Sequence, residues 1–409
     1  MSEPEGVCMV NSIVRLGIFA FSCTVAIRAQ DLGGDRKSIE RLLEKIEALE
    51  RRVSELEAER RGKVGEIAQQ SAPQPVEPEE RPQAASTPMM NIRGFADIGY
   101  AGERSGQWQN SFGLGQVDLI ITSRLSERLG ILVEAIFEHD AKNATAVDLE
   151  RVLLQYRHNQ YLNVDAGRFH TGIGYYNTAF HHGSWFQTAA GRPLLFRFED
   201  EGGMLPIHNV GVSITGKIPS GKLGLHYLAE IGNGRDYPSE EQVQNRFDGN
   251  NGKSVNFGLW AKPEMLSGWR FGGSAYHDRL QTAGAPKLRQ EIYAGYAVYE
   301  RGRWELMNEA LLMRHRNAAG TTSVPGFYSQ ASYRIRSWRP YARYEWMNLP
   351  GRDPVVKLTG ANPGLTQQVT GGIRYELAEF AALKFQAGRQ FHAQHGISLF
   401  TGVQLAFTF

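Results

Sequence analysis

The last thirteen residues, ISLFTGVQLAFTF (397–409), decide the fold. Counting back from Phe409, the residues two, four and six positions earlier are apolar, and the residues between them are polar or small. A period of two is the spacing of side chains on one face of a β-strand. The chain therefore ends in a strand with one apolar and one polar face.

The same alternation recurs upstream and predicts sixteen strands. Each strand with its connection takes about 20 residues, which suits strands of about 9–11 residues. Even-numbered strands are followed by short connections and odd-numbered strands often by long ones, as in a transmembrane antiparallel β-barrel. The expected strands are 91–101, 113–125, 130–139, 148–157, 160–168, 208–217, 222–231, 253–262, 269–278, 287–299, 303–315, 325–335, 338–348, 366–377, 380–390 and 397–409.

The composition agrees with a large β structure and excludes several classes of protein. The 409 residues include 45 Gly, 16 Tyr, 20 Phe and 7 Trp, and the net charge of +2 argues against a nucleic-acid partner. No apolar run of about 20 residues follows the first thirty positions, which argues against a helical membrane protein. Cys8 and Cys23 are the only cysteines, so disulfides and thiolate sites are excluded from Gln30 onward.

Residues 1–29 are interpreted as a cleaved signal peptide. Arg15 precedes the apolar run 16–27, which is too short to span a membrane well. Met9 is an alternative start, because the eight residues before it carry acidic side chains where basic ones are expected. A lipoprotein signal ending at Cys23 is a poorer alternative, since its motif lacks the usual leucine.

Residues 30–70 are interpreted as a coiled-coil oligomerisation segment. Apolar residues occupy the a and d positions of three heptads, and charged residues fill the flanks. An amphipathic helix packed on a globular domain is the alternative, but the apolar stripe is as narrow as a coiled-coil seam. The seam residues are Ile39, Leu42, Ile46, Leu49, Val53 and Leu56.

A proline-rich linker, 71–89, separates this segment from the expected barrel, 90–409. Residues 71–88 contain five prolines among polar and small residues, a composition that builds no core and acts as a semi-rigid spacer. The linker marks the domain boundary.

Periodicity alone does not say which face of each strand is outside, and a soluble sandwich would alternate too. The terminal aromatic strand resembles the assembly signal of bacterial outer-membrane barrels. The whole architecture resembles trimeric porins, and most closely the phosphate-selective porin O/P-like superfamily with an N-terminal coiled coil. The segment AGRFHTGIGYYNT (Ala166–Thr178) is similar to the strand-to-loop passage of that superfamily. The lysine-rich loop of its phosphate-selective members is not evident, so phosphate specificity is not implied.

This resemblance implies a barrel in the bacterial outer-membrane lipid bilayer, a periplasmic coiled coil and a homotrimer. The heptads, with β-branched a positions and leucine at d, favour parallel dimers in isolated peptides, so trimer and dimer both stay open. In porin-like barrels the third external loop folds into the lumen. Here the corresponding connection is 169–207, whose many aromatic side chains call for burial.

Strand alternation and this loop supply the candidate pore-lining residues. Either they filter solutes by charge or they pair within a polar interior, and pairing is the more common outcome. The candidates are Arg93, Arg124, Arg151, Arg157, Arg168, Arg192, Arg197, Glu199, Asp200, Glu201, Arg334, Arg336, Arg343 and Arg374. The same rule assigns to the lumen Arg270, Arg289 and Lys384, and the acids Asp97, Asp118, Glu134, Glu138, Glu345 and Glu376.

The charge balance favours anions slightly. Residues 1–90 hold 12 Lys and Arg against 15 Asp and Glu, which leaves 33 basic and 28 acidic residues from position 91 onward. The expected barrel is therefore basic by five charges.

Catalytic and metal motifs are not evident. Four histidines bracket the loop (His170, His181, His182 and His208), but no HExxH or comparable spacing accompanies them. Ser184 lacks the GxSxG context of a hydrolase nucleophile. We therefore expect no enzyme activity, metal or cofactor.

The function expected from the sequence is that of a porin passing small polar, and by charge anionic, solutes by diffusion. The alternative is a structural anchor that contacts periplasmic or cell-wall partners through the coiled coil. Residues 405, 407 and 409 (Leu405, Phe407 and Phe409) form the expected assembly signal.

Overall fold

The fold is seen in a computed structural model that describes residues 89–104, 108–139, 145–180, 183–198, 203–235, 252–280, 287–359 and 361–409. The expected signal peptide, the coiled coil and residues 71–88 of the linker lie outside these residues, whereas Met89, the last residue of the expected linker, belongs to β1. No helix among the described residues is both long enough and apolar enough to cross a membrane.

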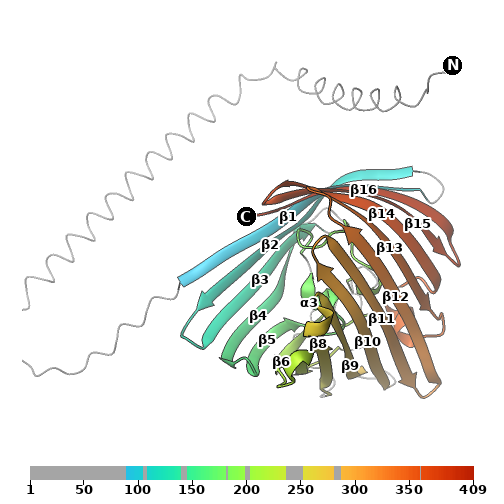
Figure 1. Ribbon diagram of the computed structural model, residues 1–409. Helices are drawn as coiled ribbons and strands as arrows, with labels where there is room; N and C mark the ends of the chain where they lie inside the picture. The colour runs from blue at the N-terminus through green and yellow to red at the C-terminus, as the bar shows by residue number, and fades with distance from the viewer. Residues whose placement is uncertain are drawn as a thin grey trace, which may run out of the picture. The chain divides into compact units, whose positions relative to one another are not determined.

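Sixteen antiparallel strands form one closed barrel, which confirms the expected fold and strand number (Figure 1). Each strand pairs with its neighbours in the chain. The strands are β1 (Met89–Arg104), β2 (Trp108–Arg124), β3 (Leu129–His139), β4 (Thr145–Asn159), β5 (Leu162–His170), β6 (His208–Lys217), β7 (Leu225–Gly232), β8 (Ser254–Ala261), β9 (Trp269–Leu280), β10 (Leu288–Arg301), β11 (Trp304–Asn317), β12 (Gly320–Tyr333), β13 (Trp338–Leu349), β14 (Gly364–Ala378), β15 (Ala381–His392) and β16 (Gly396–Thr408).

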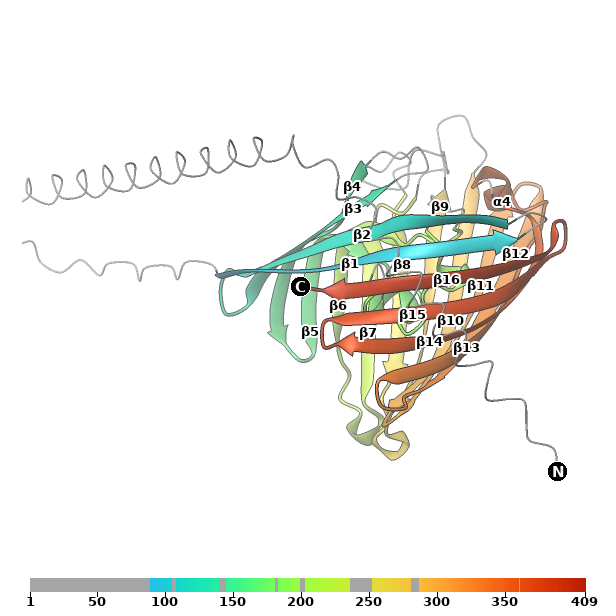
Figure 2. The same ribbon diagram turned by 90° about the horizontal axis from the view of Figure 1, so that it is seen from above.

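The C-terminal strand closes the barrel against β1 (Figure 2). Phe409 exchanges two backbone hydrogen bonds of 2.9 Å with Gly94, just beyond the end of β16. The ring of Phe409 lies over Gly94, where a Cβ atom would come within 2.5 Å of it. Closure leaves no unpaired sheet edge, which would otherwise expose a row of backbone donors and acceptors.

Several strand ends differ from those expected, among them the starts of β12 and β7. β12 begins at Gly320 rather than at residue 325, because a two-residue connection joins it to β11 in a tight hairpin. Pro325, the first residue of the expected strand, lies within β12. β7 begins at Leu225 rather than at residue 222, because the 3₁₀ turn η3 (Gly221–Leu223) occupies the start of the expected strand.

The longest connections lie at the end of the barrel opposite the start of β1 and the end of β16. They join β5 to β6 (171–207), β7 to β8 (233–253) and β13 to β14 (350–363). The first contains the short helix α3 (Tyr176–Ala179) and the 3₁₀ turn η1 (Leu194–Phe196); the third contains α4 (Pro354–Leu358). The turns at the other end are short, such as the two-residue connection at Gly302.

The expected orientation of β10 is wrong. Leu288, Ile292 and Val298 are buried inside the barrel, whereas Arg289 and Tyr293 are exposed on the outer face. Alternation was correct, but the apolar face of this strand packs against the long connection inside the barrel and therefore points inward. Arg289 consequently faces outward and not into the lumen.

Candidate functional site

The candidate site is the interior of the barrel, which the connection 171–207 crosses. This segment leaves the wall at β5, and its described residues bond to side chains of β1, β7, β9, β11 and β13–β15. Strands on opposite sides of a closed barrel can share one partner only through the lumen. The segment, called the crossing loop below, therefore lies inside.

Buried carboxylates of the wall accept hydrogen bonds from the backbone of the crossing loop. Glu309 on β11 accepts from the N–H groups of Tyr175 and Tyr176 at 2.6 and 2.9 Å. Glu230 on β7 accepts from Gly172 at 3.0 Å, and Glu345 on β13 accepts from Leu194 at 2.6 Å. A loop has few backbone partners of its own, so these acids satisfy donors that would otherwise be buried at a cost.

Buried cations of the wall bind backbone carbonyls of the same loop. Arg343 donates to the carbonyls of Gly191 and Arg192 at 2.8 and 3.2 Å. Lys384 on β15 donates to the carbonyls of Ser184 and Ala189. The guanidinium of Arg343 also pairs with Glu345 at 2.8 Å, and both side chains are only 2% exposed.

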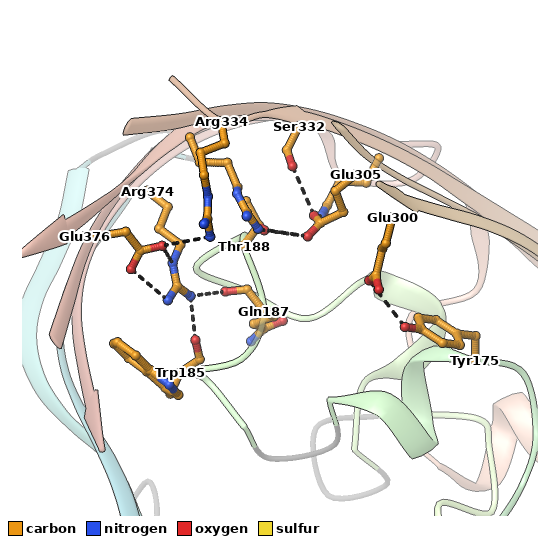
Figure 3. Close-up of polar contacts among 12 residues, drawn as sticks. Tyr175, Trp185, Gln187, Thr188, Glu300, Glu305, Ser332, Arg334, Arg374 and Glu376 are labelled. Atoms are coloured by element: carbon orange, nitrogen blue, oxygen red, sulfur yellow. Dashed lines mark hydrogen bonds and ion pairs between the residues drawn. The ribbon is translucent and has the colours of Figure 1, made fainter. Parts of the chain in front are cut away.

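Arg374 on β14 forms a third cationic anchor (Figure 3). It donates to the carbonyls of Trp185 and Gln187, and its guanidinium lies 4.9 Å from the centre of the Trp185 ring. Glu376, two residues further along the same face, accepts from Arg374 at 2.8 Å. Arg334 approaches the same carboxylate at 4.0 Å.

Side-chain contacts complete the attachment. The hydroxyl of Thr188 donates to Glu305 at 3.0 Å, and Arg339 on β13 donates to both of them. Figure 3 shows Glu305 also accepting from Ser332 of β12. Arg339 was not among the expected site residues, although it lies on the same inward face as Arg343.

Aromatic packing fixes the middle of the crossing loop. Tyr176 is fully buried, with its ring centre 5.2 Å from that of Phe196 and 6.3 Å from that of Tyr328 on the wall. Burial raises the pKa of Tyr176 to about 12, so its hydroxyl stays protonated and donates to Gln187. The expected burial of the aromatic side chains of the loop is confirmed for Tyr176 and Phe196.

Several arginines that we expected to line the pore form ion pairs or hydrogen bonds with residues of the barrel strands. Arg151 pairs with Glu134, and Arg157 pairs with Asp165 at 2.5 Å. Arg168 is 6% exposed and donates to the backbone carbonyl of Glu150, so it lies in the wall rather than on the pore. These residues, like Arg343 and Arg374, form ion pairs or hydrogen bonds within the protein.

Arg197 is the exposed cation of the described part of the crossing loop. It lines two cavities, one of about 420 Å³ beside Leu349 and His392, and one of about 370 Å³ beside Asp97. Asp97 on β1 accepts from Ser184 and Gln404 at 3.1 and 2.9 Å. The cavity beside Asp97 therefore has a guanidinium on the loop and a hydrogen-bonded carboxylate on the wall.

The neighbouring Arg192 is held more tightly than Arg197. Its Nε donates to the carbonyl of Phe196 at 2.7 Å, and its guanidinium lies 3.7 Å from the centre of the Phe198 ring. It borders the smaller cavity together with Arg197.

Four other expected cations lie near the short turns. Arg93, Arg124 and Arg334 are exposed at strand ends, and Arg336 lies in the β12–β13 turn with a φ of 55°. Arg336 is therefore a turn residue and not part of a strand face. Glu199, Asp200 and Glu201, with His181 and His182, lie outside the described residues.

One group of side chains has the composition of a metal site. Donor atoms of Glu150, His170 and His208 lie within 4.8 Å of one another, where β4, β5 and β6 run side by side. His208 already pairs with Glu150, and the positive charge of Arg168 acts on His208. Because His208 is already paired with Glu150 and His170 lies 3.5 Å from Glu134, we assign no metal here.

Comparisons with known proteins agree on the architecture. No protein-family model and no curated protein matches the sequence. Among solved structures, the anion-selective porin from Comamonas acidovorans has a TM-score of 0.56 and 12% identity over 79% of this chain and 100% of its own. The outer membrane channel DcaP of Acinetobacter baumannii has a TM-score of 0.54 and 10% identity over 80% of this chain and 99% of its own. The trimer form of OmpT, an outer membrane protein of Vibrio cholerae, has a TM-score of 0.53 and 10% identity over 79% of this chain and 100% of its own. At these identities the likeness shows a shared fold.

Proposed function

We propose that the chain is an outer-membrane porin that lets small polar solutes, preferentially anions, diffuse through a barrel narrowed by the crossing loop. The observation that carries this proposal is the loop itself. It is bound across the lumen by buried charges of the wall and leaves cavities lined by the exposed Arg197. The structural neighbours described as an anion-selective porin and an outer membrane channel support the proposal.

The anion preference follows from which charges stay available to solutes. Glu230, Glu309 and Glu345 are buried and occupied by the crossing loop, as are Arg343 and Lys384. Apart from these two sets, the exposed Arg197 faces the cavity that it shares with the hydrogen-bonded carboxylate of Asp97, and further exposed arginines lie near the short turns, so the exposed cations outnumber that acid. A pore lined by exposed cations favours anions.

The remaining parts of the proposal concern assembly. We propose a signal peptide over 1–29, a periplasmic coiled coil over 30–70 and a linker over 71–89 ahead of the barrel. A homotrimer is supported by the trimer form of the OmpT neighbour. Membership of the phosphate-selective porin O/P-like superfamily stays a prediction, based on the segment Ala166–Thr178.

Reconstitution in planar bilayers tests the proposed function. The purified full chain should give stepwise conductance and, in a salt gradient, a reversal potential on the anion-selective side. Arg197→Gln should move that potential toward zero selectivity. The matched control is Arg389→Gln, because Arg389 is exposed on the outer face of β15, opposite Val369 and Leu399. Absence of conductance steps would reject the pore, and a cation-selective potential would reject the anion preference.

A further inference from the structure

Three arginines lie side by side on the outer face of β9, β10 and β11. Arg289 is directly opposite Arg279 on one neighbouring strand and Arg316 on the other. All three side chains are exposed. The adjacent Gln290 is buried and bonds to His315 and Arg235 inside the barrel, so Arg289 faces outward by alternation.

This row concentrates positive charge where the sheet alone would disfavour it. One step along the same face, the exposed Arg314 lies opposite Glu291, so the described residues of the patch include four arginines and one acid. Like charges directly opposite each other destabilise a sheet. Within the described residues, Arg289, Arg314 and Arg316 form no ion pair, and an external anion would relieve the repulsion.

The length of β11 gives the position of the row along the membrane normal. Trp304, the first residue of β11, is exposed and packs on Tyr333 near the short turns, as residues of an interfacial aromatic girdle do. A strand that rises about 3.3 Å per residue and tilts by about 40° climbs about 2.5 Å per residue along the membrane normal. An apolar band about 25 Å tall then ends about ten residues later, at the level of Arg314 and Arg316.

We propose that this row, Arg279, Arg289 and Arg316 with Arg314 beside it, binds the phosphate groups of a phosphorylated lipid of the outer leaflet. Arginine suits this ligand because its planar guanidinium binds phosphate oxygens in pairs. Below the row, Tyr293 and Leu312 lie directly opposite each other and are 45% and 38% exposed, which offers an apolar surface to the acyl chains. This inference rests on the outer-membrane location proposed above.

Native mass spectrometry of the purified full chain with bis-phosphorylated lipid A tests the assignment. We expect the wild type to retain the lipid, and the combined variant Arg279→Gln, Arg289→Gln and Arg316→Gln to bind it at least tenfold more weakly. Arg389→Gln is the matched control and should bind as the wild type does. If the combined variant fails to fold, Arg289→Gln alone should still weaken binding measurably, because it removes the centre of the row.

Three results would overturn the assignment. If dephosphorylated lipid A binds as tightly as the phosphorylated form, the phosphate groups play no part in recognition. If inorganic phosphate at equal concentration displaces the lipid completely, the row is a simple anion site. If the combined variant binds lipid A normally while its oligomeric state changes, the row is a subunit interface. Conductance separates this inference from the pore: the combined variant should conduct as the wild type does, whereas a chain without conductance would contradict the proposed function instead.

Discussion

Replacing Arg343 by Met should release the crossing loop from one side of the barrel. The substitution removes two hydrogen bonds to the carbonyls of Gly191 and Arg192 and leaves Glu345 buried without its ion-pair partner. Losing one partner of a buried pair costs about 3–5 kcal/mol. Because the barrel strands are held by their own backbone ladders, we expect this cost to appear as local opening of residues 189–195.

The opening can be measured with a single cysteine. A cost of about 3–5 kcal/mol makes the open state roughly 10²- to 4 × 10³-fold more populated, since about 1.4 kcal/mol corresponds to a factor of ten. Leu195 is 3% exposed and packs on Gly326, so a cysteine at this position reacts with a thiol reagent only when the loop opens. The native Cys8 and Cys23 are first replaced by Ser, which leaves no other thiol in the chain.

Labelling of Leu195→Cys should therefore be about 10²-fold faster, or more, when Arg343→Met is present. Arg389→Met, which also removes an arginine but from the outer face, should leave the rate unchanged. Equal labelling rates with Arg343 and with Met at that position would refute the anchoring role. Faster labelling in both variants would show a general loosening of the barrel instead.

Three further predictions concern the frame around the loop. Burial alone would raise the pKa of Asp353, but hydrogen bonding to His315 outweighs it and lowers that pKa. The Asp353 cap of α4 should therefore stabilise the helix above about pH 4 and lose this effect as the pH falls further. Amide exchange in α4, corrected for intrinsic rates, should show the loss, and Asp353→Asn should abolish the pH dependence. Gly167→Ala should cost about 2–3 kcal/mol of barrel stability, because Gly167 has a φ of 133° and an added Cβ would meet the Val152 carbonyl; an unchanged temperature for the heat-dependent gel shift of the folded barrel would contradict this. Deleting Phe409 should remove two hydrogen bonds to Gly94, worth about 1 kcal/mol each, and lower the yield of heat-modifiable barrel, whereas an undiminished yield would argue against the closing role.

The strands could be predicted from the sequence because each one lies between two unlike environments. The period of two in 397–409 and in fifteen upstream segments located every strand, with differences at a few ends such as Gly320. The face of β10 could not be predicted in this way. Its inward residues, Leu288 and Ile292, are apolar because they contact the crossing loop, and a contact with a distant segment leaves no mark on periodicity.

The same reason limited prediction of the site. Alternation correctly placed Arg343, Arg374 and Lys384 inside the barrel, but it did not show that the backbone of the crossing loop would occupy them. Glu309 and Arg339 were not among the expected residues, because only the path of the loop gives them a role. The exposed Arg197, in contrast, was among the candidates from the loop sequence.

The conductance of a loop-deletion variant tests most directly whether the crossing loop narrows an open pore. Residues 174–198 are replaced by a short Gly/Ser linker, and single-channel conductance and reversal potential are measured beside those of the wild type. We expect a conductance several-fold larger than that of the wild type and a weaker preference for anions, because the loop and Arg197 have been removed together. An unchanged conductance with the same reversal potential would contradict the claim that solutes pass beside this loop.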